Sequence, residues 1–263
     1  MKQPTIVKKS LGQHFLCDPQ VISELVRFID PRPNDQIIEI GPGTGALTLP
    51  LLARISSLTV IELDHKLLPY LQHNCAPLLS PIGNANLEIR VENVLQTDFS
   101  KFTGPLRIVG NLPYNISSPL LFKLLGNINT IQDLHFMLQQ EVADRIAAAP
   151  GSKTYGRISV MLQYYFKICV LLKVPPQAFT PPPKVNSAIV RLTPNQNPPT
   201  VNKQKLALIV KEAFSTRRKT IANNLKNHLT SEQLKKIGIN PKLRAENLHL
   251  SEFIAITNTL DNH

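Results

Sequence analysis

The first 190 residues alternate short β-branched runs with segments of helical periodicity, and this alternation limits the fold more than any other feature of the sequence. Strands that alternate with helices predict parallel strands joined by crossover helices, with helices on both faces of the sheet. We therefore expect an α/β fold with a doubly wound sheet. The expected strands are residues 36–40, 58–62, 87–91, 106–110, 133–139, 168–174 and 185–192.

The end of the chain has a different pattern. Residues 193–200 are rich in Pro and Asn and poor in apolar side chains, which is typical of a linker. Residues 203–260 show helical periodicity and little β signal, so a small all-helical domain is expected there. We therefore expect two domains, residues 1–194 and residues 195–263.

Net charge is concentrated in this tail. The whole chain carries +11, and residues 200–263 contain eleven Lys and Arg against five Asp and Glu, giving +6. A basic region of this kind favours a polyanionic partner that docks partly on the tail. The alternative is a basic surface that is only solvated.

The cysteines and the apolar segments indicate in which cellular compartment the protein is expected. Cys17, Cys75 and Cys169 are odd in number and far apart, which argues against disulfides and a zinc site. The seven histidines add no metal-ligand spacing. The first residues lack the apolar stretch of a secretory signal, and residues 158–172 are too short and too interrupted to span a bilayer. We expect a cytoplasmic monomer with no metal and no membrane partner.

A glycine-rich turn follows the first long strand. Gly41, Gly43 and Gly45 lie between this strand and a helix, where they let the backbone approach a ligand closely. The third glycine comes one position earlier than in dinucleotide sites. Glu62 ends the next strand, where a carboxylate is placed to bind a ribose diol. With Glu39 before the turn, this pattern favours S-adenosylmethionine over NAD; the alternative is that Glu62 is an ordinary solvated carboxylate.

The tetrapeptide Asn111-Leu112-Pro113-Tyr114 follows the fourth expected strand, at the edge of the sheet where open α/β folds bind ligands. An adenine amine is a poor nucleophile because its lone pair is delocalised into the ring. The Asn111 side-chain oxygen and the Leu112 carbonyl offer two acceptors that would localise that lone pair. Pro113 stiffens the turn, and Tyr114 offers a ring that stacks on a base. The alternative is a plain Asn-Pro turn after a strand.

Phe179 lies on a loop framed by prolines and is a candidate for the opposite face of the same base. The residues alone favour a core or lid phenylalanine at this position. A base held on both faces must leave its stack, so the expected substrate base is flipped out or single-stranded.

Four motifs recur in the order found in a known family. The runs KSLGQHFL from Lys9, EIGPGTGALT from Glu39, NLPYNIS from Asn111 and FTPPPKVNS from Phe179 resemble those of the ribosomal RNA adenine dimethyltransferases. The resemblance covers nearly the whole chain. It implies a Rossmann-like class I methyltransferase sheet followed by a small helical domain. It is strongest to the members that dimethylate two adjacent adenosines in the 3′-terminal hairpin loop of 16S rRNA, within the small subunit.

The resemblance also implies roles for residues. The segment from Gln13 to Leu16 would close over the methyl donor. Asn93 stands where family members usually carry Asp, and its carbonyl oxygen can still accept a hydrogen bond from the adenine amine of the donor. The cofactor-binding residues expected in this way are Gln13, His14, Leu16, Gly41, Gly43, Gly45, Glu62, Leu63, Asn93, Val94 and Asn111.

The tail carries three consecutive cations, Arg217, Arg218 and Lys219, in a segment that resembles the family's tail. We expect them on a helix, where they would meet phosphates and give salt-sensitive RNA affinity. A solvated basic face is the alternative.

Three other functions remain open at this point. The same chemistry could act on large-subunit rRNA, as in resistance methyltransferases that share the glycine turn and the Asn-x-Pro-Tyr core. The chain could instead be a ribosome-assembly factor in which methyl transfer is incidental. A DNA adenine methyltransferase fits least, because no added DNA-recognition domain is evident.

Overall fold

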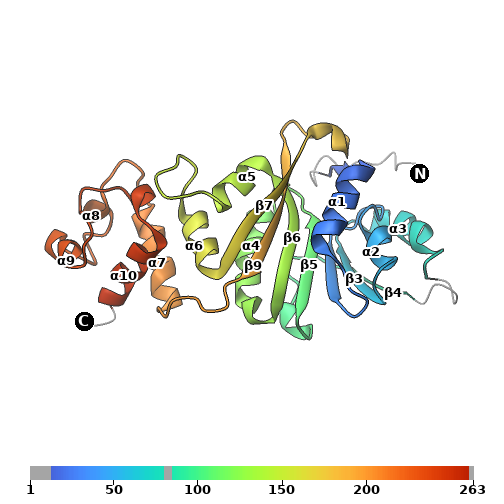
Figure 1. Cartoon of the computed structure of the whole chain (residues 1–263), viewed down its shortest axis with the longest axis horizontal. Helices are drawn as coiled ribbons and strands as arrows, with labels where there is room; N and C mark the ends of the chain where they lie inside the picture. Colours follow the sequence, from blue (N-terminus) through green and yellow to red (C-terminus); the bar gives the residue numbers. More distant parts are fainter. Residues whose placement is uncertain (1–12, 80–84, 261–263) are drawn as a thin grey trace. The chain divides into compact units, whose positions relative to one another are not determined.

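The computed structural model of the chain describes residues 13–79 and 85–260 (Figure 1). The described residues form two compact units. The first contains the residues up to Ala143 together with Cys169–Pro194, and the second contains Asp144–Ile168 together with the residues from Asn195 onward. The expected functional division, residues 1–194 and residues 195–263, remains a prediction.

The first unit is built on a seven-stranded sheet in the order β4-β3-β2-β5-β6-β9-β7. The pairs β2–β3, β2–β5, β3–β4 and β5–β6 are parallel, whereas β6–β9 is antiparallel. The expectation of a doubly wound α/β fold is confirmed, with a mixed sheet rather than a wholly parallel one. Its strands are β2 (Gln36–Ile40), β3 (Ser57–Glu62), β4 (Asn86–Val91), β5 (Leu106–Asn111), β6 (Ile131–Gln139), β7 (Phe166–Val174) and β9 (Ser187–Pro194).

Strand order reverses at β2, and this reversal positions the site. From β2 the chain adds β3 and β4 on one side, and then crosses to β5 on the other. Ile38 pairs with Thr59 of β3 and with Ile108 of β5, so three parallel strands end side by side. The crevice beyond the carboxyl ends of such strands is where open α/β sheets bind ligands.

One face of the sheet packs against three helices. These are α1 (Pro19–Ile29), α2 (Thr48–Leu52) and α3 (Leu68–Cys75), whose apolar side chains form one buried cluster with β2, β3, β5 and β6. The start of α1 follows from its sequence, because the Asp18 carboxylate accepts the Gln20 N–H at 2.8 Å and Pro19 has no N–H that would need an acceptor. Ile38, Ile108 and Phe136 face the other way and are also buried, so both faces of the sheet are covered.

Two short helices follow the strands in the middle of the chain. Helix α4 spans Ser117–Leu124 and follows the tetrapeptide at the end of β5. The Ser117 hydroxyl donates to the Pro113 carbonyl at 3.2 Å, which attaches the first turn of this helix to the tetrapeptide. Helix α5 (Gln140–Ile146) follows β6 directly.

A second sheet of two short strands was not expected. Strand β1 (Phe15–Leu16) pairs antiparallel with β8 (Phe179–Thr180), so that Phe15 faces Thr180 and Leu16 faces Phe179. Cys17 N–H extends the pairing by donating to the Ala178 carbonyl at 2.8 Å. Residues 13–18, here called the strap, are therefore fixed to the loop that carries Phe179.

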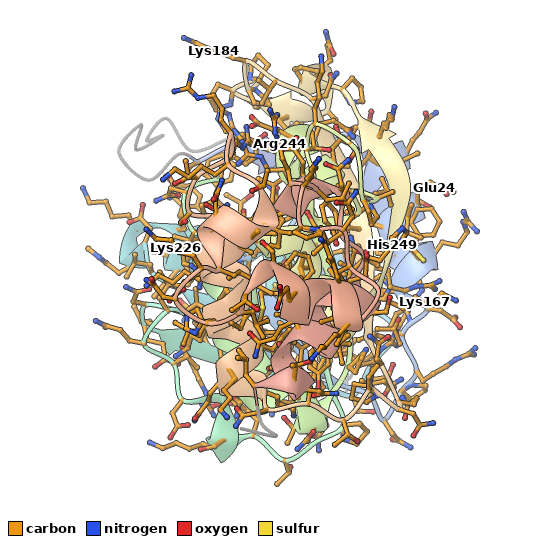
Figure 2. The ribbon with its side chains drawn as sticks, turned by 90° about the vertical axis from the view of Figure 1, so that its left-hand side faces the viewer. Glu24, Lys167, Lys184, Lys226, Arg244 and His249 are labelled. Atoms are coloured by element: carbon orange, nitrogen blue, oxygen red, sulfur yellow. The ribbon has the colours of Figure 1, made fainter. Side chains whose placement is uncertain are left out.

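The second unit is helical over residues 203–260, as expected. It contains α6 (Arg157–Tyr165), α7 (Lys203–Ala213), α8 (Ile221–Asn224), α9 (Ser231–Lys236) and α10 (Leu250–Thr259). Asn195 joins the first and last parts of this unit, because its side chain donates to the main-chain carbonyls of Gln163 and Tyr164 at 3.1 and 2.9 Å. Lys226 and Arg244 are exposed on this unit (Figure 2).

Candidate active site

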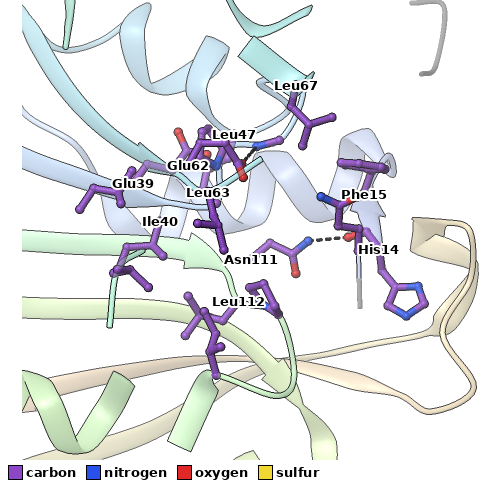
Figure 3. A pocket seen from close by; sticks show the side chains of 18 of the residues that line it. His14, Phe15, Glu39, Ile40, Leu47, Glu62, Leu63, Leu67, Asn111 and Leu112 are labelled. Carbon is purple, nitrogen blue, oxygen red and sulfur yellow. Dashed lines mark hydrogen bonds between the residues drawn. The ribbon is translucent and has the colours of Figure 1, made fainter. Parts of the chain in front are cut away.

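A cavity of about 290 Å³ lies at the carboxyl ends of β2, β3, β4 and β5 (Figure 3). Leu25 of α1 and five segments line it: strap residues 13–16, the end of β2 with the glycine turn, the end of β3 with Leu67, residues 92–95 after β4, and residues 111–116 after β5. Of the expected site residues, the cavity brings together Gln13, His14, Leu16, Gly41, Gly43, Glu62, Leu63, Asn93, Val94, Asn111, Leu112, Pro113 and Tyr114.

The glycine turn has the backbone that only glycine adopts easily. Gly41 and Gly43 have φ of 68° and 58°, in the left-handed region. A Cβ on Gly43 would lie 3.1 Å from the Phe15 ring, and one on Gly41 would lie 3.7 Å from the Asn111 carbonyl oxygen. Gly43 therefore lets the Phe15 ring of the strap approach the turn closely, whereas Gly41 is required by its left-handed backbone. Gly45, with φ of 95°, faces Leu71 of α3 instead and does not line the cavity.

Glu62 lies at the end of β3 with its carboxylate held by the main chain. Its two oxygens accept the Gly43 N–H at 3.2 Å and the Asp64 N–H at 2.8 Å. Burial raises the pKa of Glu62, and these main-chain donors oppose that rise. A carboxylate oxygen accepts more than one hydrogen bond, so Glu62 keeps acceptor capacity toward a diol in the cavity.

Glu39 also lines the cavity, although the sequence predicted only that it precedes the turn. Its carboxyl group is completely buried and accepts the Thr48 hydroxyl at 2.7 Å. Burial raises the pKa of Glu39 to about 8, with a further contribution from the nearby Glu62. Burial at this position therefore favours the neutral form of the Glu39 carboxyl group.

Asn93 lies in the turn after β4 and lines the cavity. Its side-chain oxygen accepts the Leu95 N–H at 3.0 Å, which fixes the turn and orients the amide. An expected contact between this oxygen and the adenine amine of a donor would use its second lone pair. That contact remains a prediction.

The tetrapeptide is fixed at both ends. Asn111 closes β5, and its side-chain NH2 donates to the His14 main-chain carbonyl at 2.8 Å. Leu112 N–H donates to the Met137 carbonyl at 3.2 Å, which holds the next residue on β6. The Tyr114 hydroxyl lies 2.9 Å from the Ser187 hydroxyl, and burial raises the pKa of Tyr114. The Tyr114 side chain is therefore fixed at its hydroxyl group, and Tyr114 also lines the cavity.

Phe179 is placed differently from the expectation. Its side chain is 2% exposed, belongs to the buried cluster with Leu16 and Leu25, and does not line the cavity. The ring that lies near Tyr114 is His14, with centroids 5.6 Å apart and planes inclined by 30°. A contact between Phe179 and a substrate base remains a prediction and would require the Phe179 side chain to leave this cluster.

The three consecutive cations are exposed, but the expectation that they lie on a helix was wrong. Arg217, Arg218 and Lys219 form a turn between α7 and α8. The reason is at the helix ends: Phe214 ends α7, and the Thr220 hydroxyl caps α8 by accepting the Asn223 N–H.

Within residues 13–79 and 85–260 there is no group of three His, Cys, Asp or Glu side chains that could hold a metal ion. In the same part of the chain, no helix is long and apolar enough to cross a membrane. Residues 9–12 of the first motif lie outside the described residues.

Comparison with known proteins gives consistent results. The family model for ribosomal RNA adenine dimethylase matches residues 5–262. A ribosomal RNA small subunit methyltransferase A of Legionella pneumophila is 48% identical over 257 residues, which cover 97% of this chain and 98% of that protein. The protein of that name from Xylella fastidiosa is 49% identical over 261 residues, with 97% and 96% covered.

Two solved structures share the fold. A dimethyladenosine transferase from Plasmodium falciparum superposes with a TM-score of 0.82 at 26% identity, covering 95% of this chain and 98% of that one. The 23S rRNA methyltransferase ErmE superposes with a TM-score of 0.75 at 24% identity, covering 94% and 99%. The chain therefore shares its fold with these two methyltransferases.

Proposed function

The chain belongs to the ribosomal RNA adenine dimethylase family, and we propose that it dimethylates two adjacent adenosines in the 3′-terminal hairpin loop of 16S rRNA. It is an S-adenosylmethionine-dependent rRNA adenine dimethyltransferase. The observation that carries the proposal is that one cavity is lined by two sets of polar groups. Glu62 and Asn93 offer acceptors at the ends of β3 and β4, and the Asn111 tetrapeptide lies at the end of β5.

The residues present fit S-adenosylmethionine. The Glu62 carboxylate is held in place by main-chain N–H groups and can accept hydrogen bonds from the ribose hydroxyls. Leu63 and Val94 offer apolar walls for the adenine. The left-handed glycines leave space beside these groups. When bound, the cofactor supplies a methyl group on a positively charged sulfur. The Glu62 carboxylate, which lines the same cavity, favours that charge.

The tetrapeptide prepares the acceptor amine. The Asn111 side-chain oxygen and the Leu112 main-chain carbonyl accept the two amine hydrogens and localise the nitrogen lone pair. The Tyr114 ring holds the base by stacking, worth about 1–3 kcal/mol. The reaction requires orientation and electrostatic stabilisation, and it needs no side-chain nucleophile. After one transfer a single amine hydrogen remains, so the second transfer uses one of the two acceptors.

The substrate is tested with radiolabelled S-adenosylmethionine and isolated ribosomal subunits that lack this modification. We expect label on the small subunit, and none on large subunits or DNA. Label on the large subunit alone would favour the chemistry of the resistance enzymes. Binding to small subunits without any label would favour an assembly factor.

Glu62→Gln is expected to weaken cofactor binding about tenfold to a hundredfold, because a hydrogen bond to a charged acceptor is worth about 1.5–3 kcal/mol. The glutamine NH2 would also face a main-chain N–H that now donates to a carboxylate oxygen. Calorimetric titration with S-adenosylhomocysteine measures the change. Glu24→Gln on the exposed face of α1 is the matched control. An unchanged Kd for Glu62→Gln would contradict the assigned role.

Replacing Arg217, Arg218 and Lys219 together with glutamine is expected to weaken RNA binding and to reduce its salt dependence. If each cation meets one phosphate, the slope of log K against log salt should fall by about 2–3. Binding of a 16S rRNA fragment is measured at several salt concentrations. The control variant loses the same number of positive charges, because the exposed Lys235, Lys236 and Lys242 are replaced with glutamine. Equal losses in both variants would show that these three cations have no special position on the RNA.

A further inference from the structure

The orientation of the Asn111 amide is set by the strap. An amide has one donor end and one acceptor end, and the donor end of Asn111 binds the His14 carbonyl at 2.8 Å. Its oxygen is therefore turned away from the strap (Figure 3). Exchange of the two ends would bring two oxygens together, which no proton can bridge, so only one orientation is compatible with this contact.

The His14 carbonyl is in turn held by its own side chain. The His14 Nδ1 lies 2.7 Å from the Pro181 carbonyl oxygen, and because a carbonyl only accepts, Nδ1 carries the proton. Pro181 follows β8 directly, so this bond continues the pairing of Phe15 with Thr180. The imidazole thus fixes the residue whose carbonyl fixes Asn111.

The strap is attached to the cofactor side of the cavity as well. The Phe15 ring lies against Gly43, where a Cβ would come within 3.1 Å of it. The Gln13 amide donates to the Asp64 carboxylate at 3.2 Å, two residues beyond Glu62. The glycine turn, β8 and the tetrapeptide therefore all meet at the strap, and all of these residues lie in the first unit.

We propose that His14 is a positioning residue for methyl transfer: its imidazole locks the strap on Pro181, and its main-chain carbonyl turns the Asn111 oxygen toward the acceptor amine. The inference rests on the proposed function of Asn111. It also explains why an amide stands at position 111. A carboxylate could accept the amine hydrogens, but it would present only acceptors to the His14 carbonyl.

The test compares His14→Leu with His14→Asn. Leucine lacks a donor, whereas the Asn side-chain NH2 can occupy nearly the position of Nδ1 and donate to the Pro181 carbonyl. We expect kcat to fall about tenfold to a hundredfold in His14→Leu, since displacement of a catalytic group by about 1 Å can cost about a hundredfold. In His14→Asn we expect kcat to recover most of this loss. The KM for RNA should stay nearly constant in both variants.

Two results of this comparison would overturn the proposal. One is an unchanged kcat in His14→Leu at saturating cofactor and RNA, with only the cofactor Kd raised, because His14 would then be a cofactor contact alone. The other is equal loss of kcat in both variants. An inactive wild-type protein would instead mean that the proposed function has failed, so the two failures are distinguishable.

A second measurement does not depend on activity. In Asn111→Asp, repulsion from the His14 carbonyl should release the strap, and hydrogen exchange of the Cys17 amide, which donates to Ala178, should be faster than in the wild type. Asn111→Ala removes the donor without adding repulsion and should give intermediate exchange. Identical exchange in Asn111→Asp and the wild type would contradict a coupling between Asn111 and the strap.

Discussion

Asn111→Ala is expected to lower the rate of methyl transfer about a hundredfold to a thousandfold, the cost found when one oriented polar group is removed from an active site. The side-chain oxygen of Asn111 is one of only two acceptors proposed for the target amine, and the other is a main-chain carbonyl that no substitution removes. Single-turnover rates with small subunits measure the change in the transfer step itself.

Cofactor binding should change much less in this variant, because Glu62 and the glycine turn stay in place. Asn86→Ala is the matched control and should transfer methyl groups at the wild-type rate, because Asn86 lies at the amino end of β4 and its side chain donates to the Ser57 hydroxyl at 3.4 Å, away from the cavity. If Asn111→Ala kept more than about a tenth of the wild-type rate, the proposed role of this amide in transition-state stabilisation would be wrong.

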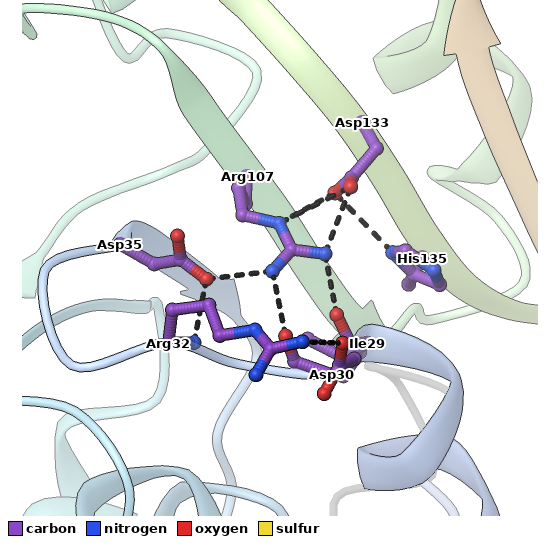
Figure 4. A network of polar contacts seen from close by, with 7 residues as sticks. All are labelled: Ile29, Asp30, Arg32, Asp35, Arg107, Asp133 and His135. Atoms are coloured by element: carbon purple, nitrogen blue, oxygen red, sulfur yellow. Dashed lines mark hydrogen bonds and ion pairs between the residues drawn. The ribbon is translucent and has the colours of Figure 1, made fainter.

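Arg107→Met is expected to lower the free energy of unfolding by about 3–5 kcal/mol, the usual cost of leaving a buried charge without its partner. Arg107 lies near the amino end of β5, at the opposite end of the strand from Asn111. Figure 4 shows the polar network around Arg107. Its guanidinium binds Asp133 at 2.8 Å and Asp35 at 2.6 Å, and it also donates to the main-chain carbonyls of Ile29 and Asp30. The three charged side chains are 8%, 12% and 16% exposed for Arg107, Asp133 and Asp35.

Chemical denaturation measures this change. Arg32→Met is the control, because Arg32 pairs with Asp30 at the same short distance of 2.6 Å but on the surface, with side chains 72% and 65% exposed. Such a pair is worth about 0–1 kcal/mol. The double variant Arg107→Met/Asp133→Leu should recover part of the loss, since it leaves one fewer buried charge unpaired. Equal effects of Arg107→Met and Arg32→Met would refute the network's contribution.

The same network predicts a pH dependence of stability. Burial alone would raise the pKa of Asp133, but the adjacent His135 and Arg107 side chains outweigh burial and hold that pKa below its usual value. A carboxyl group with a lowered pKa stabilises the fold above its unfolded pKa, and the stabilisation is lost as the pH falls through the folded pKa. We therefore expect the wild type to lose this contribution below about pH 4, and Arg107→Met to show a shallower loss.

The residues at the carboxyl edge of the sheet were predictable for a physical reason. Parallel strands end at one edge, so a glycine turn, a carboxylate and an Asn-Pro-Tyr turn that each follow a strand must come together there. Gly41, Glu62 and Asn111 do so in the structure. The sequence pattern of each strand was sufficient to predict these positions, because each residue's position in the fold depends on its own strand and not on a distant partner.

The strap and the buried ion network could not be predicted in this way. Strands β1 and β8 are two residues long and lie more than 160 positions apart, so neither shows a periodicity of its own. Arg107 occupies an ordinary strand position, and its burial depends on Asp35 and Asp133 from other elements. In both cases long-range packing decides the role of the residue, and the local sequence carries no sign of it.

The central claim is tested most directly by nucleoside analysis of 16S rRNA from unmodified small subunits, after incubation with S-adenosylmethionine and either the wild-type protein or Asn111→Ala. We expect N6,N6-dimethyladenosine at two adjacent adenosines of the 3′-terminal hairpin with the wild type, and almost none with Asn111→Ala. Absence of dimethyladenosine with wild-type protein that binds the cofactor, or equal amounts with both proteins, would contradict the account.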